Sequence, residues 1–219
     1  DPVLAGWLRM GIASVLGLGL LAILRIPLPL HKRAHLAYAY ASLGVFGAMC
    51  CTYIASRYVP SGLISIFFGL SPMLSAMLGM KLLDEPALRP YRWVACALAF
   101  IGLGVIFTDD VVLGRESIPG VILLLMAVCL FSISGVLVKR TAAQIHPLAH
   151  TVGALLWSLP GFGITWWLMG AAPLEIEIGN RAFWAILYLA IFGSLIGFVG
   201  YFHVLRHPAP STVALVTLI

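Results

Sequence analysis

The chain has 219 residues, of which 62% are hydrophobic and 10% are charged, and its formal net charge is +5. Soluble domains contain about 45–50% apolar and about 25% charged residues, so this composition argues strongly against a soluble globular protein. A nucleic-acid-binding protein is also disfavoured, because the basic residues lie in several short loops and form no basic stripe interleaved with aromatic residues.

The sequence is a series of apolar runs, each closed by a short charged or proline-containing break. A helix needs about 20 apolar residues to cross the hydrocarbon layer of a bilayer. The pattern predicts an all-α integral membrane protein, a polytopic helix bundle with about seven full transmembrane helices and a partial eighth that begins near Ser211. The seven expected spans are residues 5–26, 36–56, 62–83, 91–107, 119–137, 149–169 and 183–205.

Both ends of the sequence look cut. The chain begins at Asp1 without a methionine, and it stops at Ile219, only nine residues into the last apolar run. We therefore expect a fragment that lacks membrane helices at one or both ends.

The charged breaks sort into two groups if successive breaks alternate between the two sides of the membrane. One group then holds nine Lys and Arg residues and the other holds three. Short loops of this kind obey the positive-inside rule. The richer side, which contains Arg25, Lys81 and Lys139, is expected to be cytoplasmic.

Three pairs of histidines are spaced by four residues, a spacing that on a helix can hold one metal ion. All of them lie at the ends of expected spans, and Pro147 and Pro208 interrupt two of the pairs. We therefore expect solvated or interfacial histidines, no metal site and no cofactor. The pairs are His31 and His35, His146 and His150, and His203 and His207.

Two pairs of segments repeat each other along the chain. Asp1-Pro2 precedes the first span, and His146-Pro147 precedes the sixth, 145 residues later. Tyr53 near the end of the second span has its counterpart in Tyr201 near the end of the seventh, 148 residues later. Each pair is five spans apart, and because five is odd the partners cross the membrane in opposite directions. This arrangement is typical of the inverted-topology repeat of secondary transporters.

The second to fourth spans show a Tyr, a short tight turn, a helix with a proline in its middle, a terminal Glu and then a glycine-rich helix. The same order is typical of the EamA-type exporters of the drug/metabolite transporter superfamily, which the chain resembles over nearly its whole length. Arg9 and Tyr201 also fall where the family pattern has Arg and Tyr. The segments that carry the resemblance are residues 53–63, 70–76, 81–85 and 99–105.

The resemblance implies ten helices in two inverted five-helix repeats. Residues 1–108 would be the remainder of the first repeat, helices 2 to 5, and residues 109–219 a truncated second repeat, helices 6 to 8 and the start of helix 9. The second repeat departs from the family pattern, because it ends before its own mid-span proline and terminal Glu.

The expected span 62–83 carries a row of polar and aromatic residues at helical spacing. Ser65, Phe68, Ser71 or Pro72, and Ser75 recur every three to four residues, which places them on one helix face. Pro72 lacks the N–H that would bond the Phe68 carbonyl. The row can line a solute cavity near a flexible kink, or it can be a small-residue face for close helix packing.

Other candidate residues for solute binding lie in the first, second and seventh spans. Met49 and Tyr53 share a stripe of the second span, and Phe192, Ser194 and Tyr201 belong to a similar stripe of the seventh. Aromatic and Met side chains can grip an amphipathic solute, whereas Tyr at a helix end can also be an interface anchor.

Arg9 is the one Lys or Arg well inside an expected span. It can bind a substrate carboxylate, pair with a helix that this sequence lacks, or extend outward to the interface. No Asp or Glu lies inside a span, which leaves facilitated transport, exchange and coupling through further helices all open.

These features predict a secondary transporter and not an enzyme. We expect it to move small organic metabolites, such as amino acids, related amphipathic solutes or drugs, outward by alternating access around a central cavity. Its expected partners are the solute and the lipid bilayer, with no nucleic acid, and its expected location is the cytoplasmic membrane, as a bacterial inner-membrane protein. Two alternatives remain: a membrane scaffold or non-transporting subunit, and an intramembrane serine protease with Ser134 as nucleophile and His150 or His203 as base.

Overall fold

The computed structural model describes residues 2–84, 94, 98, 101–102, 117–141, 143–170 and 181–205, with the side chain of residue 182 excluded. Every regular element in this part of the chain is a helix, which confirms the predicted all-helical class for these residues. Five of the helices are long and apolar enough to cross a membrane: Pro2–Ile23, Lys32–Ala55, Ser61–Leu82, Ile118–Arg140 and Phe183–Leu205.

These five helices overlap five of the seven expected spans. The expected span 149–169 is also a helix, Pro147–Leu168, but it is not among the five that are long and apolar enough. The expected span 91–107 lies outside the described residues, apart from Val94, Leu98, Ile101 and Gly102, which are helical. The total of seven spans therefore stays a prediction.

Three of the long helices are composite. Residues 32–55 form α2, the π-helical segment η1 and α3 without a break, and residues 181–205 form α9, the π-helical segment η3 and α10. Residues 61–82 form α4 and α5, which are separated by a turn at Gly69 and Leu70. The elements in chain order are α1 (Pro2–Ile23), α2 (Lys32–Ser42), η1 (Leu43–Ala48), α3 (Met49–Ala55), α4 (Ser61–Phe68), α5 (Ser71–Leu82), α7 (Ile118–Arg140), α8 (Pro147–Leu168), α9 (Arg181–Tyr188), η3 (Leu189–Ile196) and α10 (Gly197–Leu205).

The end of α1 shows how the sequence sets a helix boundary. Arg25 has φ 52°, and its N–H donates to the Ala22 carbonyl at 3.2 Å while the Ile26 N–H donates to the Leu21 carbonyl at 3.0 Å. These two bonds are the Schellman pattern that satisfies the last carbonyls of a helix. Pro27 follows and cannot continue the helix.

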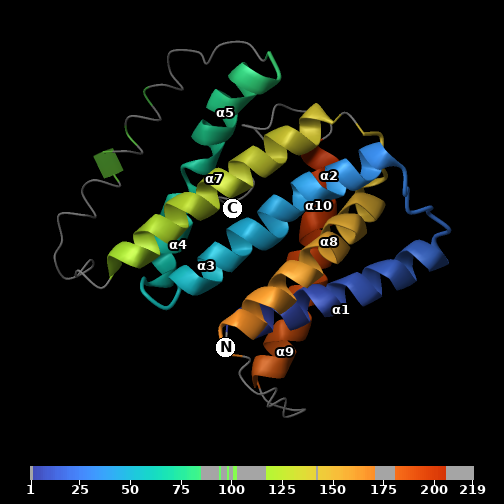
Figure 1. Cartoon of the computed structure of the whole chain (residues 1–219), viewed down its shortest axis with the longest axis horizontal. Coiled ribbons are helices and arrows are strands. Elements are labelled where there is room, and N and C mark those ends of the chain that lie inside the picture. The colour runs from blue at the N-terminus through green and yellow to red at the C-terminus, as the bar shows by residue number, and fades with distance from the viewer. Residues whose placement is uncertain are drawn as a thin grey trace.

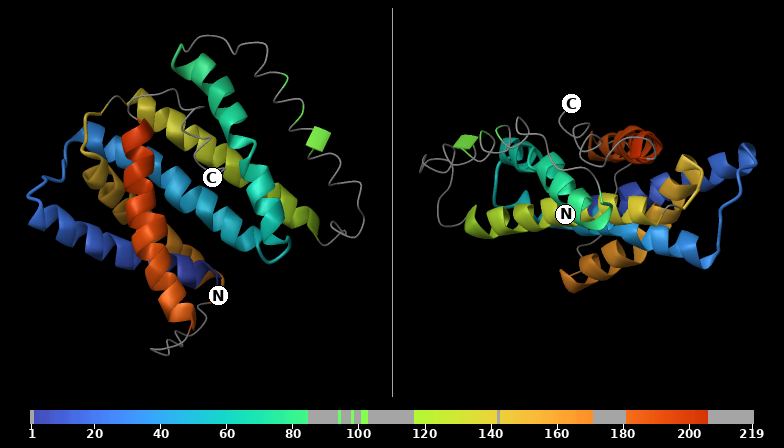
Figure 2. Two further views of the ribbon diagram at one scale, coloured as in Figure 1. Left: turned by 180° about the vertical axis from the view of Figure 1, so that it is seen from behind. Right: turned by 90° about the horizontal axis from the view of Figure 1, so that it is seen from above.

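The helices pack in layers, and the first three long helices run in alternate directions, as do the last three (Figure 1). The long helix of residues 32–55 lies beside α7 along much of its length. Much of α8 lies on one side of this pair, whereas α4–α5 and α9–α10 lie on the other side (Figure 2). The main core forms where α1, α8 and the 32–55 helix meet, around fully buried Met10, Leu155 and Phe162.

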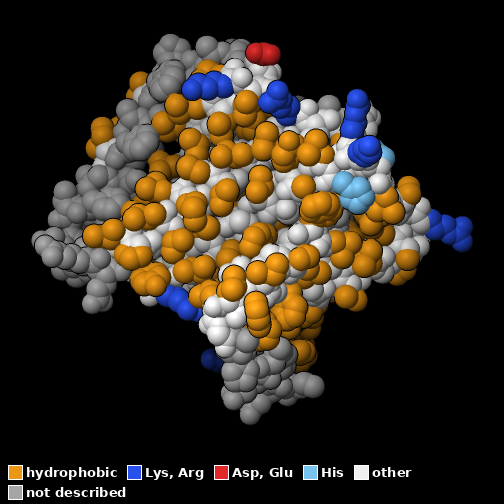
Figure 3. Space-filling view, viewed as in Figure 1, with side chains coloured by type: hydrophobic (Ala, Val, Ile, Leu, Met, Phe, Trp, Pro, Cys, Tyr) orange, Lys and Arg blue, Asp and Glu red, His pale blue; other side chains and the backbone are white. Residues whose placement is uncertain are grey.

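The charged residues on the surface of the described part of the chain are found at the two ends of the bundle, and the sides of the helices are apolar (Figure 3). Arg25, Lys81 and Arg140 lie at the end where α1, α5 and α7 finish, whereas Arg57 and Arg181 lie at the opposite end. Large apolar side chains point outward along the helices, for example Val15, which is 70% exposed, and Leu168, which is 72% exposed. This is the surface expected of a protein whose solvent around the bundle is lipid.

Candidate functional site

Arg9 points into the bundle and is only 9% exposed. Its Nε donates a hydrogen bond to Ser194 Oγ at 2.7 Å, and its Nη1 donates to Tyr53 Oη at 3.1 Å. The three residues, here named the Arg9 cluster, come from α1, α3 and η3. The structure has the Arg9 side chain hydrogen-bonded to two helices inside the bundle, which argues against the alternative that it extends to the interface.

Two glycines make room for the Arg9 cluster. A Cβ atom on Gly6 of α1 would lie 2.6 Å from Cε2 of Tyr53, and a Cβ atom on Gly193 of η3 would lie 2.8 Å from Nη2 of Arg9. Both distances are shorter than non-bonded carbon contacts allow. A larger residue at either position would displace the Tyr53 ring or the guanidinium.

The surroundings of the Arg9 cluster are apolar. Met10 and Phe162 are fully buried beside it, and the Ser194 hydroxyl donates to Met10 Sδ at 3.8 Å. The Tyr53 ring lies 6.5 Å from the Phe162 ring, measured between centroids. The cluster is therefore a small polar island in the hydrophobic core.

The charge of Arg9 has no counter-ion among the described residues. A guanidinium is always protonated in proteins and has five N–H donors, and the bonds to Ser194 and Tyr53 use two of them with neutral acceptors. Asp84 is the one acidic residue in the described part of the chain, and it lies just beyond the end of α5. A buried charge without a counter-ion is costly, and inside a membrane protein it marks a functional site by default.

Two other candidate residues flank one aromatic ring of α7. Phe68 of α4 and Tyr201 of α10 lie on either side of Phe131, with ring centroids 5.9 Å and 5.6 Å away. The Tyr201 hydroxyl lies so close to Gly135 that a Cβ there would be 2.7 Å from it. The structure thus joins Phe68 and Tyr201 through Phe131, a residue that the sequence analysis did not single out. We name these three residues the aromatic row.

The turn at Gly69 and Leu70 splits the row of residues predicted on one face of the third span. Ser71 and Ser75 of α5 are buried at 0% and 3% exposure, and Ser132 of α7 donates to the Ser71 carbonyl at 3.3 Å. Ser65 of α4 is exposed. The turn interrupts the helical phase, so residues at a spacing of three to four across it no longer share a face.

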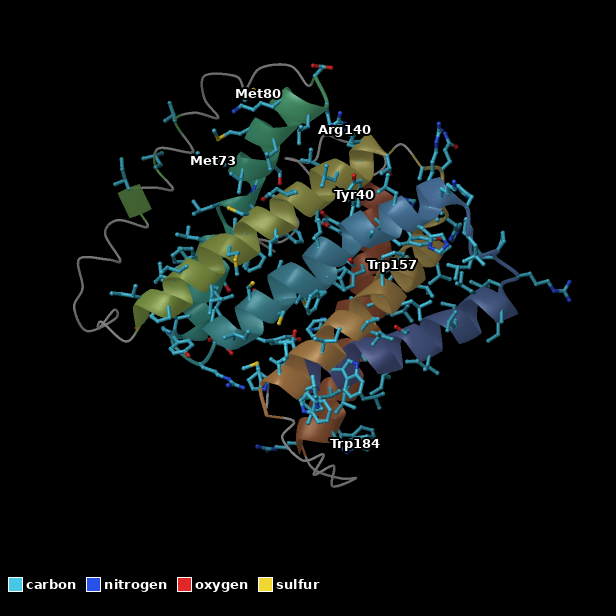
Figure 4. The ribbon with its side chains drawn as sticks, in the orientation of Figure 1. Tyr40, Met73, Met80, Arg140, Trp157 and Trp184 are labelled. Carbon is cyan, nitrogen blue, oxygen red and sulfur yellow. The ribbon has the colours of Figure 1, made fainter. Side chains whose placement is uncertain are left out.

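The two halves of that row therefore have different neighbours. Ser71 and Ser75 belong to the contact of α5 with α7, while Met73 and Met80 lie on the side of α5 away from α7 (Figure 4). Pro72 is half-buried at the start of α5, within its first turn. Proline is favoured there because the missing N–H has no partner in the first turn of a helix.

Met49 and Phe192 have different positions relative to the Arg9 cluster. Met49 is half-buried and packs against the main core, to which Tyr53 also contributes. Phe192 is 52% exposed and stacks on Tyr188, with ring centroids 4.8 Å apart. The structure brings Arg9 and Tyr53 together and leaves Phe192 on the outside of η3.

His150 departs from the expectation of a solvated or interfacial histidine. It is 6% exposed, and its ring is stacked on Phe202 at 4.3 Å with an interplanar angle of 4°. Pro147 begins α8 and so places His150 one turn inside the helix, against α10. The expectation was wrong because the first turn of α8 is packed between neighbouring helices.

The hydroxyl of Ser134, the possible nucleophile, is bonded to a backbone carbonyl. It donates to the Tyr40 carbonyl at 2.8 Å, across the contact between α7 and α2 (Figure 4 labels Tyr40). His150 is stacked on Phe202 in another part of the bundle. A serine nucleophile needs its base within hydrogen-bond reach, an arrangement that these contacts do not provide.

Comparison with known families gives one match. The sequence model of the EamA-like transporter family matches residues 1–108 and 118–219, which together make up most of the chain. No curated protein matches the chain. The match agrees with the resemblance expected from the motifs around Tyr53 and Pro72, and with the five apolar helices. The chain is therefore an integral membrane protein that belongs to the EamA-like transporter family.

Proposed function

We propose that the protein is a secondary transporter that moves small organic metabolites outward across the cytoplasmic membrane by alternating access. The observation that carries this proposal is the Arg9 cluster. It puts a buried, fixed positive charge where helices from both halves of the chain meet, since Arg9 and Tyr53 belong to residues 1–108 and Ser194 to residues 109–219. Secondary transporters bind their solutes at such a junction between two repeats, near the middle of the bilayer.

The helix contacts support an inverted repeat. If α1 corresponds to α8, and the 32–55 helix to the 181–205 helix, then exchanging the two halves should turn each contact into another observed contact. The contact of α1 with η3 exchanges with that of α8 with η1, and the contact of α1 with α3 exchanges with that of α8 with α10. The contact of α1 with α8 exchanges with itself.

The two π-helical segments support the same correspondence. η1 begins at Leu43 and η3 begins at Leu189, 146 residues later, which is close to the offset of 148 between Tyr53 and Tyr201. A π-helical turn contains an extra residue within an α-helix and is frequently found at functional sites. We propose that these two segments let the repeat-related helices change register during alternating access.

The surroundings of the site favour amphipathic solutes such as amino acids. The Arg9 cluster offers a charge and hydroxyl groups, while Phe162 and Met10 beside it offer an apolar wall. The aromatic row lies at the contact of α7 with α4 and α10, and it provides further ring surface for an apolar solute body. The outward direction and the bacterial inner membrane rest on the family resemblance and on the basic helix ends, which we assign to the cytoplasm.

The test is flux of solutes by the intact protein in liposomes. We expect saturable counterflow of at least one member of a panel of radiolabelled amino acids, and the same rate in the Ser134→Ala variant. Binding of a partner protein without flux of any solute would favour the scaffold alternative. Peptide cleavage that is lost in Ser134→Ala would favour the protease.

A further inference from the structure

We propose that the solute recognised by this transporter carries a carboxylate, and that the solute carboxylate is the counter-ion of Arg9. This inference rests on the proposed function and adds the chemical class of the ligand. It begins from the burial of Arg9, which is 9% exposed and bonded to two neutral hydroxyl groups. The described part of the chain supplies no acidic side chain to this site, and a solute carboxylate would supply the missing negative charge.

The geometry of the guanidinium suits a carboxylate. Ser194 occupies Nε and Tyr53 accepts one bond from Nη1, which leaves further N–H groups on Nη1 and Nη2. The two terminal nitrogens of a guanidinium can bind both oxygens of a carboxylate at once. Ser194 and Tyr53 are positioning residues in this arrangement, because they hold the plane of the guanidinium from two different helices.

The number of charges in the interior favours a singly charged group over a phosphate. Every other described Lys or Arg lies at a helix end or in a loop, so Arg9 is the one cation in the interior of the described bundle. One guanidinium and one carboxylate neutralise each other, which lowers the cost of holding either charge away from water. A phosphate dianion would leave an excess negative charge in an apolar core.

The same reasoning predicts how the site recognises the rest of the solute. Met10, Phe162 and Leu155 are fully buried around the cluster and offer no hydrogen bond to a second charged group. We therefore expect an apolar or aromatic body. An amino group on the solute is not required, because no described acidic side chain in the interior would bind it.

The experiment compares matched acids and amides on the intact purified protein. Thermal stabilisation by ligand gives a Kd, since a ligand that binds only the folded state adds RT ln(1 + L/Kd), where L is the free ligand concentration, to the free energy of unfolding and so raises the melting temperature. The probes are butyrate and butyramide, 3-phenylpropanoate and 3-phenylpropanamide, and phenylalanine and phenylalaninamide. We expect the acid of at least one pair to bind at least about tenfold more tightly than its amide, which corresponds to a difference of about 1.4 kcal/mol in binding free energy. Equal binding of acid and amide in all three pairs would overturn the inference. This comparison uses the native protein and needs no mutation.

Variants then assign the preference to Arg9. In Arg9→Gln the acid should lose about 30-fold or more in affinity while the amide is little affected, as when one partner of a buried charge pair is removed. Arg9→Lys keeps the charge but loses the two-nitrogen edge, so it should retain only part of the preference. Arg33→Gln removes the same charge from an exposed position at the start of α2 and should leave both affinities unchanged. An acid preference that persists in folded Arg9→Gln would contradict the role of Arg9.

The positioning role of Tyr53 and Ser194 has its own readout. Tyr53→Phe and Ser194→Ala should each weaken acid binding and reduce the acid-to-amide ratio, whereas a merely structural role would lower stability and leave the ratio unchanged. The counterflow assay tests the carboxylate assignment and the proposed transport separately. Flux without any acid preference removes only the carboxylate assignment, whereas no flux of any solute removes the proposed transport.

Discussion

The two helices α1 and α8 have the same length and pack against each other, yet the side chains that they bury have different chemistry. Both contain 22 residues. Arg9 of α1 is bonded to Tyr53 and Ser194, whereas Ala154, 145 residues later, is a fully buried alanine in an apolar contact. The repeat that we propose therefore relates the backbones of the two halves and not their side chains, since α1 carries a buried charge where α8 carries a buried alanine.

Each of these helices also meets a tyrosine of the 32–55 helix through a glycine. Gly6 of α1 faces Tyr53, and Gly153 of α8 faces Tyr38. Tyr53 accepts a bond from the charged Arg9, whereas Tyr38 donates to the carbonyl of Pro29 at 3.1 Å. The close approach of helices through small residues is common in membranes, and here it serves a charged contact on one helix and a neutral one on the other.

The largest expected effect comes from adding a second charge to α8. Ala154→Arg would bury a cation where no hydroxyl pair is built to receive it, and a buried unpaired charge costs at least about 3–5 kcal/mol. We expect the variant not to yield folded protein, as judged by size-exclusion chromatography and thermal denaturation in detergent. Ala154→Ser is the matched control. A folded Ala154→Arg protein as stable as the native one would contradict this expectation, because it would show that α8 tolerates a buried arginine as α1 does.

The next largest effect is the difference in stability between variants of the two tyrosines. Tyr53→Phe removes the acceptor from a charged donor, for which a hydrogen bond is worth about 1.5–3 kcal/mol, whereas Tyr38→Phe removes a neutral bond worth about 0.5–1.5 kcal/mol. Chemical or thermal denaturation of both variants should therefore rank Tyr53→Phe as the more destabilised. The reverse order would mean that the Arg9 bond is weak in the folded protein.

The smallest effect comes from the glycines themselves. Gly153→Ala would place a methyl group against the fully buried Tyr38 ring, and such overpacking destabilises a protein by about 1–3 kcal/mol. The better helix propensity of alanine offsets about 1 kcal/mol of this loss. Gly19→Ala on α1 is the matched control, because nothing lies within 4 Å of its Cβ position, and it should be neutral or slightly stabilising. Equal melting temperatures for the two variants would contradict the close contact of Gly153 with Tyr38.

The sequence was sufficient for much of the fold, because long apolar runs and charged breaks are local signals. The expected span 183–205 corresponds to a helix that begins at Arg181 and is described as far as Leu205. A kink was predicted from Pro72, and the structure has a turn just before it at Gly69 and Leu70. The change of helical phase at this turn and the π-helical segments were not predicted, because they leave no mark on the composition. A row of serines at helical spacing could therefore not be assigned to one face.

For the site, the sequence singled out the charge but not all of its partners. Arg9 stood out because a cation inside an apolar run is costly. Its contact with Ser194 spans 185 residues of chain, and no local pattern encodes such a pairing. Phe131 was missed for the same reason, since an aromatic residue in an apolar helix carries no signal until its neighbours Phe68 and Tyr201 are placed.

The most direct test of the central claim is whether the Arg9 cluster lies on the solute path. A cysteine at position 194, in a variant of the intact protein without its native cysteines, can be labelled with a small membrane-impermeant thiol reagent in liposomes. We expect Ser194→Cys to be labelled from the aqueous phase and a transported solute to slow this labelling. The control Val15→Cys, on the outer face of α1, should not be labelled. Labelling of Ser194→Cys that never occurs in a transport-active protein, or that no solute slows, would contradict the central claim.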